Sequence, residues 1–323
     1  MAEEREMNRR EFLKSTVALT ALAVSSSLRL DCSSEELAKR KFTMNLNVGQ
    51  VGVRADPFEA IKLAQDYGYE SVTPMPWHLL RYSESELARL AGKMKTAGLT
   101  WGAAGVRSFF VNDDTRFNER KQEIIRTAKV LQRVGGTRCF TWTMSSSDIL
   151  MYMENFRLHV KRLREAGNIL ADHGLRLGIE YLGTRMFAVR GKYPFIRTSA
   201  ETKRLTAEVG LANVGIALDS WHWFQAGETE EDILKLANQD VVTADICDAP
   251  PDIPREQMPD SPRRLPCTTG VIDAKAFLRG LVNIGYDGPV GTEPFDRSLS
   301  KMSAERAMAV ATGAMKRAFA LIE

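Results

Sequence analysis

Val214-Gly215-Ile216-Ala217-Leu218-Asp219-Ser220-Trp221-His222 joins a short apolar run to a carboxylate and, three residues later, to a histidine. The apolar run 214–218 is typical of a buried strand, so Asp219 falls at the end of that strand. Burying an unpaired carboxylate is costly, and such a group usually meets a metal ion or a cation. This stretch therefore predicts a buried strand that delivers a functional side chain at its C-terminal end.

Three further apolar runs end in an acidic residue in the same way. They are 177–179 before Glu180, 241–244 before Asp245 and 289–292 before Glu293. Neighbouring parallel strands place equivalent ends about 5 Å apart, so four carboxylates would repel each other unless a divalent cation lay among them. Oxygen-rich ligation favours one Mn²⁺, Mg²⁺ or Co²⁺ ion over Zn²⁺. Each acid alone is equally well interpreted as a salt-bridged surface residue, but the repeated strand-end position favours a metal site.

Strands and helices alternate along the chain from residue 40 onward. Alternating apolar residues predict strands, and apolar residues at helical spacing between capping residues and glycines predict helices. The predicted strands cover 42–48, 70–74, 99–106 and 139–142, followed by the four that end in acids. The predicted helices cover 57–67, 83–97, 114–134, 152–173, 199–209, 229–236, 272–284 and 303–322. Eight such units predict an α/β fold with parallel strands, a single (β/α)8 TIM barrel over 40–323.

Other polar and aromatic residues follow strand ends, where such a barrel carries its site. Trp77 and His78 come after the second strand and could line a sugar pocket, and Arg107 after the third could hold a hydroxyl or phosphate group. An ordinary loop position is an equal or better interpretation of each. His159 and His173 fall on or at the end of a predicted helix, which favours packing or surface roles.

The N-terminal segment carries a targeting pattern. Asn8-Arg9-Arg10-Glu11-Phe12-Leu13-Lys14 has the twin-arginine arrangement, and the mildly apolar segment 15–28 is too short and too polar for a membrane span. We therefore expect a twin-arginine signal peptide and linker over 1–35, with the export machinery as a partner and a periplasmic or otherwise exported location. A basic amphipathic arm is the alternative interpretation.

Composition excludes several other classes. The chain has 323 residues, 44% of them hydrophobic, and a net charge of +3 with dispersed basic residues, which does not suggest nucleic-acid binding. Its four cysteines, Cys32, Cys139, Cys247 and Cys267, form no CxxC pair. Neither a zinc knot nor a disulfide framework is therefore indicated, although a pair between Cys247 and Cys267 stays open.

Three stretches together resemble the sugar phosphate isomerase/epimerase family of xylose-isomerase-like barrels, which includes ketose 3-epimerases, inosose isomerases and inosose dehydratases. They are 177–183, 213–222 and 285–295, and the resemblance extends from residue 42 to the C-terminus. It implies one divalent metal ion held by Glu, Asp, His and Glu from successive strands. Glu180, Asp219 and Glu293 match the first, second and fourth ligands, and the two glutamates match the family's acid/base pair.

The resemblance also implies roles for residues outside the strand ends. His222 matches a histidine that contacts substrate oxygens, and Arg263, or Arg264 beside it, matches an arginine that binds substrate hydroxyls. Asp245 departs from the family pattern, because it stands where the motif His-x-x-Asp places the third ligand. Cys267 likewise stands where a glycine is expected. Barrels of this family often pair through their helices, which implies a homo-oligomer.

These observations predict a metal-dependent isomerase or epimerase of a small keto sugar or ketoinositol. A carboxylate would remove the proton beside the ketone and form an enediolate. A dehydratase or lyase acting on a 3-keto sugar or glycoside by the same enolisation is the alternative. A non-catalytic sugar-binding barrel and a phosphodiesterase like endonuclease IV rank lower, the latter because the chain has only four histidines.

Overall fold

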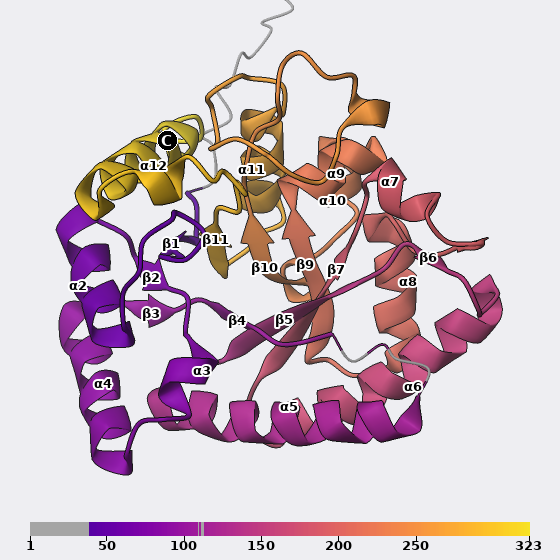
Figure 1. The fold of residues 1–323 in the computed structure, drawn as a ribbon, viewed down its shortest axis with the longest axis horizontal. Coiled ribbons are helices and arrows are strands. Elements are labelled where there is room, and N and C mark those ends of the chain that lie inside the picture. Colours follow the sequence, from indigo (N-terminus) through magenta and orange to yellow (C-terminus); the bar gives the residue numbers. More distant parts are fainter. Residues whose placement is uncertain (1–38, 109, 111–112) are drawn as a thin grey trace, which may run out of the picture. The chain divides into compact units, whose positions relative to one another are not determined.

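One sheet of parallel strands forms the centre of the molecule (Figure 1). The computed structural model describes residues 39–108, 110 and 113–323, so the predicted signal segment and Cys32 lie outside the described residues. The strands of this sheet are β1 (Thr43–Leu46), β2 (Ser71–Val72), β3 (Thr100–Trp101), β4 (Ala103–Gly105), β5 (Arg138–Thr143), β7 (Arg176–Tyr181), β9 (Val214–Asp219), β10 (Val241–Asp245) and β11 (Pro289–Gly291).

The sheet closes on itself through a strand that is interrupted at Gly102. The strand order begins with β3 and ends with β4, which are the two halves of this one strand. Its first half pairs with β2 and its second half with β5. A Cβ on Gly102 would lie 2.3 Å from Oδ1 of Asn45, so a larger residue there would have to displace the Asn45 side chain. The predicted single (β/α)8 barrel is therefore confirmed.

Eight helices follow the strands in the predicted order. They are α2 (Pro57–Tyr67), α4 (Glu84–Ala97), α5 (Asp114–Val134), α6 (Tyr152–Ala171), α8 (Ser199–Val209), α10 (Glu230–Ile233), α11 (Ala274–Asn283) and α12 (Ala304–Phe319). Asp56 and Ser83 form capping boxes, and Gly68 and Gly98 end the same two helices in the left-handed conformation. Helix α10 is shorter than predicted, because the Leu236 N–H bonds to the Ile233 carbonyl in a tighter turn.

Several short elements in the loops were not predicted from the sequence. They are α3 (Pro76–Leu79), α7 (Arg185–Ala188), α9 (Ser220–Ala226), the antiparallel pair β6 (Ser146–Ser147) and β8 (Tyr193–Pro194), and the 3-10 turns 238–240, 255–257 and 299–301. Apart from the turn 238–240, all follow the C-terminal ends of barrel strands, where they shape the mouth of the barrel.

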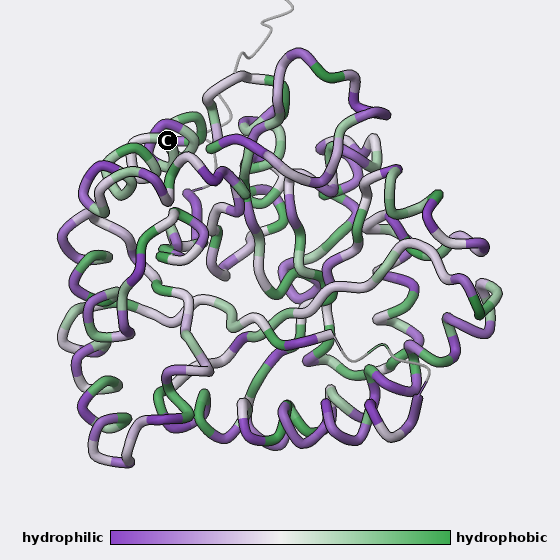
Figure 2. Tube along the Cα trace, in the orientation of Figure 1, coloured by the Kyte–Doolittle hydropathy of each residue, from purple (hydrophilic) through white to green (hydrophobic). Residues whose placement is uncertain are grey.

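Side chains on the strands alternate between the barrel interior and the helical layer. On β7, Ile179 and Tyr181 are fully buried, and the Tyr181 hydroxyl donates to Glu228, at the end of the loop after α9. Glu180 lies between them and faces the opposite way, into the barrel. Figure 2 shows hydrophobic residues along the central strands and hydrophobic residues alternating with hydrophilic ones along α5.

The described residues contain neither a disulfide bond nor a membrane-spanning helix. Cys139, Cys247 and Cys267 are free thiols, so the pairing left open between the last two is not formed in this structure. No helix in the described ranges is both long and apolar enough to span a membrane.

Candidate active site

The four strand-end acids meet at the C-terminal mouth of the barrel. Glu180 is on β7, Asp219 ends β9, Asp245 ends β10, and Glu293 follows β11 by two residues. The register pairs Asp245 with Asp219 on one side and with Gly291 on the other. We call these four residues the carboxylate arc. Its position at this edge of the barrel agrees with the arrangement expected from the sequence.

His222 forms a compact group with two members of the arc, Glu180 and Asp219. One ligand atom each from Glu180, Asp219 and His222 lie within 4.8 Å of one another. Asp219 caps α9 by accepting the Trp221 N–H at 2.8 Å, which turns the first turn of that helix back over the strand end. The His222 Nε2 atom consequently lies 3.9 Å from Oε1 of Glu180, and its buried Nδ1 atom has no hydrogen-bond partner in the described chain.

Arg263 supplies a buried positive charge to the arc. Its Nη1 atom donates to Oδ2 of Asp219 at 2.7 Å and to Oε2 of Glu293 at 3.0 Å, and the side chain is only 1% exposed. Its Nη2 atom donates to Asp260 at 3.2 Å. Phe295 lies 4.5 Å from the guanidinium, with a φ angle of +44° that non-glycine residues rarely adopt. Asp260 and Phe295 therefore hold the guanidinium in place between Asp219 and Glu293.

The neighbouring Arg264 does not take this position. Its Nη1 atom donates to the backbone oxygen of Arg263 at 3.0 Å, and its own backbone pairs with Asp248. Of the two arginines considered from the sequence, Arg263 is therefore the one that contacts the arc.

Gln50 is a site residue that the sequence reasoning missed. Its Nε2 atom donates to Oε1 of Glu293 at 2.7 Å, across 243 positions of sequence. Gln50 lies in the turn after β1, so its place after a strand end was the only signal that could have indicated it. With Arg263 on the other oxygen, both oxygens of Glu293 have a donor.

Asp245 differs from the other three acids in the contacts of its carboxylate. A Cβ on Gly291 would lie 2.5 Å from its Oδ1 atom, so this glycine leaves the space that the carboxylate fills. In the described part of the chain, the Asp245 carboxylate has neither a hydrogen-bond nor an ion-pair partner, although its backbone pairs with β9 and β11. It is also not among the three residues whose ligand atoms lie within 4.8 Å of one another.

Burial and mutual repulsion shift the titration of the arc. Burial raises the pKa of Glu180 well above its ordinary value, and the nearby Glu293 and Asp219 raise it further. Burial likewise raises the pKa of Asp245 well above its ordinary value and that of Glu293 to about 7. Burial, followed by the charge of Arg263, lowers the pKa of His222 well below its ordinary value. The single positive charge of Arg263 therefore does not balance the four carboxylates of the arc.

The donor set fits a divalent metal ion. Glu180, Asp219 and His222 offer two carboxylates and one imidazole within a short distance, and hard or borderline divalent ions accept both donor types. These three residues would hold the ion. Glu293 and Asp245, the other two predicted ligands, lie outside this group of three.

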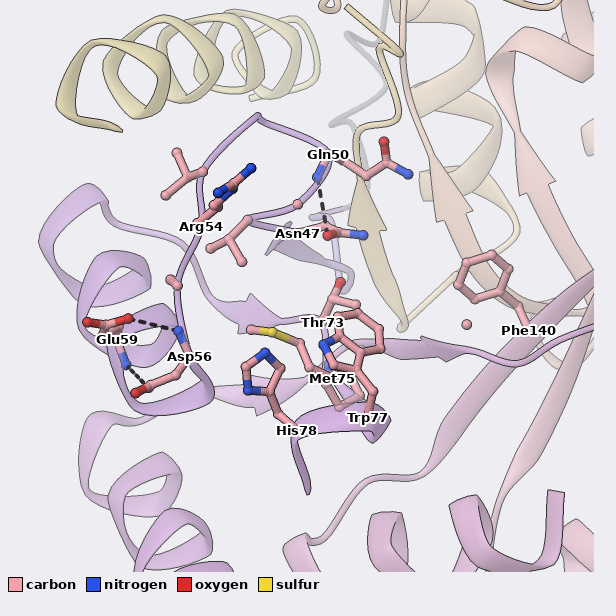
Figure 3. A pocket seen from close by; sticks show the side chains of 16 residues that line it. Asn47, Gln50, Arg54, Asp56, Glu59, Thr73, Met75, Trp77, His78 and Phe140 are labelled. Carbon is pink, nitrogen blue, oxygen red and sulfur yellow. Dashed lines mark hydrogen bonds between the residues drawn. The ribbon is translucent and has the colours of Figure 1, made fainter. Parts of the chain in front are cut away.

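A cavity of about 670 Å³, a volume that suits a small ligand, opens at the barrel mouth (Figure 3). None of the four acids lines it, and Gln50, which bonds to Glu293, is the lining residue that connects it to the arc. Its lining includes Gln50, Trp77, His78 and Phe140, and we call it the first cavity. The predicted Trp77 and His78 thus lie together at one wall. Arg107 instead lines a second cavity of about 530 Å³ next to Trp142.

His159 has the packing role expected from the sequence. Its Nε2 atom lies 2.7 Å from Oγ1 of Thr143 and its Nδ1 atom 2.8 Å from the Asn155 carbonyl. Burial lowers the pKa of His159 to about 4, so the ring is neutral at neutral pH and both of its nitrogens have partners.

Comparison with known proteins places residues 61–317 within the family model described as xylose isomerase-like TIM barrel. An inosose isomerase of Bacillus velezensis is 23% identical over 257 residues, which cover 78% of this chain and 88% of that protein. The inosose isomerase of Bacillus licheniformis is 28% identical over 152 residues, 47% of this chain. The match spans about half, 51%, of the length of that second relative.

Solved structures share the fold. A xylose isomerase domain protein from Alicyclobacillus acidocaldarius has a TM-score of 0.76 at 25% identity and covers 87% of this chain and 99% of its own. The IolI protein with a bound zinc atom has a TM-score of 0.73 at 21% identity, covering 86% and 98%. A D-psicose 3-epimerase has a TM-score of 0.67 at 20% identity, covering 83% and 94%.

Proposed function

We propose, because the chain belongs to the xylose isomerase-like TIM barrel family, that it is a divalent-metal-dependent isomerase or epimerase of a small keto sugar or ketoinositol. Relatives named inosose isomerase and a structural neighbour named D-psicose 3-epimerase support this class of activity. The observation that carries the proposal is the buried carboxylate arc, which Gln50 connects to a cavity of about 670 Å³.

Glu180 and Glu293 are the proposed acid/base pair. Burial raises the pKa of both, that of Glu293 to about 7, so near neutral pH a carboxylate and a carboxylic acid can coexist in one site. One removes the proton from the carbon beside the ketone, and the other returns a proton to the enediolate. A divalent ion, when bound, supplies the Lewis acid that polarises the ketone.

Two further side chains would orient the sugar. Arg263 lies between Asp219 and Glu293 and directs its guanidinium donors into the arc, where substrate hydroxyls would replace part of this pairing. Gln50 lines the first cavity and bonds to Glu293, so it would align this carboxylate with a bound ring. His222 and Asp219 would hold the ion together with Glu180.

Elimination from a 3-keto glycoside by the same enolisation is the second candidate function. A specific observation favours it, since the barrel mouth carries a second cavity of about 530 Å³. A glycoside has a second group to place there, whereas a single small sugar fills only one cavity.

We also propose that the chain is exported to the periplasm through the twin-arginine pathway. The arginine pair in segment 1–35 supports this location. A homo-oligomer that pairs through its helices likewise remains a prediction from the family resemblance.

Incubation with a panel of keto sugars and ketoinositols in deuterated water, with and without Mn²⁺, tests the proposed activity. We expect Mn²⁺-dependent uptake of deuterium at the carbon beside the ketone, measured by NMR or mass spectrometry. Absence of uptake from every member of the panel with Mn²⁺, Mg²⁺ and Co²⁺ alike would contradict it.

A further inference from the structure

The second cavity lies one strand away from Glu180. Trp142 lines it and pairs in register with Glu180 on the neighbouring strand β7, so both side chains face the same side of the sheet. Phe140, two residues earlier on β5, lines the first cavity. Phe140 and Trp142 face the same side of β5, so the two cavities lie next to each other along this strand.

Asn155 gives the second cavity an unused hydrogen-bonding group. This residue lies in the first turn of α6, is 7% exposed and lines the cavity. Its side-chain amide has no hydrogen-bond partner in the described part of the chain, whereas His159 one turn later has partners on both ring nitrogens. An amide that faces the cavity without a protein partner can bond to water, and a ligand hydroxyl can take the place of that water.

The remaining lining suits an uncharged ring rich in hydroxyl groups. The Trp142 side chain is 42% exposed and offers an aromatic face on which the apolar face of a sugar ring can stack. Arg107 and Arg120 line the same cavity, and its described lining includes no carboxylate. Both arginines also contact Glu123, which offsets part of their charge. Their remaining N–H donors can bind hydroxyl oxygens.

We propose that the second cavity is a subsite for a second sugar ring, so that the natural substrate is a keto sugar joined to another sugar. The inference rests on the proposed function, because it assumes that the keto ring occupies the first cavity beside Gln50 and Glu293. The joined ring then passes Glu180, stacks on Trp142 and bonds to Asn155.

Isothermal titration calorimetry of the full chain with 3-keto-glucose and with a 3-keto disaccharide that contains the same ring tests the subsite. We expect the disaccharide to bind at least 10-fold more tightly. Asn155→Ala should weaken the binding of the disaccharide about 10-fold and leave that of the monosaccharide within twofold. Asn168→Ala, on an exposed position of the same helix, is the matched control and should change neither.

Equal affinities for the two ligands in the unmodified protein, or an equal loss for both in Asn155→Ala, would overturn the subsite. If that variant does not fold, quenching of Trp142 fluorescence in the unmodified protein decides the question: quenching by the disaccharide alone supports the subsite, and equal quenching by both ligands refutes it. The Trp142→Phe variant shows which part of the protein fluorescence comes from Trp142. Deuterium exchange into the monosaccharide without disaccharide preference refutes the subsite alone, and disaccharide binding without exchange refutes the proposed activity alone.

Discussion

Glu180 and Glu293 face different sets of neighbours, although both belong to the carboxylate arc. Gln50 and Arg263 each donate a hydrogen bond to Glu293, whereas Glu180 lies 3.9 Å from the His222 imidazole, whose pKa burial lowers well below its ordinary value. Burial raises the pKa of both, but only Glu293 has donors that favour its charged form. In the metal-free site Glu180 therefore holds a proton more readily than Glu293 does, and a metal ion bound by Glu180 would displace that proton.

Replacing either glutamate should abolish proton exchange. Glu180→Gln and Glu293→Gln keep the side-chain volume but cannot accept a proton from carbon, so we expect deuterium uptake to fall by at least about 10³-fold. Glu231→Gln, on an exposed part of α10, is the matched control and should retain full exchange. Exchange at the unmodified rate in either active-site variant would disprove the acid/base assignment.

Cys267 shows why glycine was expected at its position. Its φ angle is +56°, in the left-handed region where a Cβ atom is strained. Cys267→Gly should therefore stabilise the protein by about 1 kcal/mol, measured as the free energy of unfolding in urea. Cys267→Ser keeps the Cβ atom and should leave stability unchanged; a stabilisation of equal size in both variants would assign the effect to the thiol instead.

At the scale of elements, one carboxylate anchors the long loop that carries Arg263. Asp248 is fully buried and accepts six backbone N–H groups at 2.8–3.1 Å, those of Ala249, Thr268, Thr269, Gly270, Val271 and Ile272. It thereby ties the end of β10 to the segment that leads into α11. The position of Arg263, between these two attachment points, depends on that tie.

Removing the anchor should affect both stability and binding. Asp248→Ala leaves six backbone N–H groups without their acceptor, two of them in buried hydrogen bonds, so we expect a loss of about 3 kcal/mol in the free energy of unfolding. We also expect a higher KM for the keto sugar, because the loop no longer fixes Arg263. Asp252→Ala, an exposed position in the same loop, is the control. Unchanged stability and KM in the Asp248 variant would refute this role.

The long elements could be predicted from the sequence because their signals are local. Ser83 and Asp113 start helices and Gly98 and Gly135 end them, and each signal lies within a few residues of the boundary that it sets. Helix α9 was not predicted, because its start depends on Asp219, which was interpreted only as a strand end. The contacts of Arg263 and Gln50 could not be predicted either, since they join residues 30 to 243 positions apart.

At the scale of the whole molecule, the arc lowers the stability of the metal-free barrel as pH rises. The folded pKa of Glu293 is about 7, above its ordinary value of 4.5. The folded protein therefore binds more protons than the unfolded chain between these pH values, and stability is lost as pH rises through them. A divalent cation between Glu180, Asp219 and His222 would offset this repulsion.

The increase in Tm on adding Mn²⁺ to chelator-treated protein should consequently be larger at pH 8 than at pH 5. At pH 5 protons compete with the ion for the raised-pKa carboxylates, and at pH 8 they do not. Differential scanning fluorimetry measures the shift, and Asp219→Asn should abolish it at both pH values. An equal shift at the two pH values would contradict the coupling between metal binding and the titration of the arc.

The barrel has longer strands on one side than on the other, and the strand interrupted at Gly102 belongs to the side with short strands. The strands β5, β7, β9 and β10, which carry Trp142 and three of the four acids, are five or six residues long. The strands β2, β3, β4 and β11 have only two or three residues each. Fewer interstrand hydrogen bonds make local opening easier on that side. We therefore expect the mouth to widen on the side that carries Gln50 and Glu293, while Glu180, Asp219 and Asp245 on the longer strands keep their spacing.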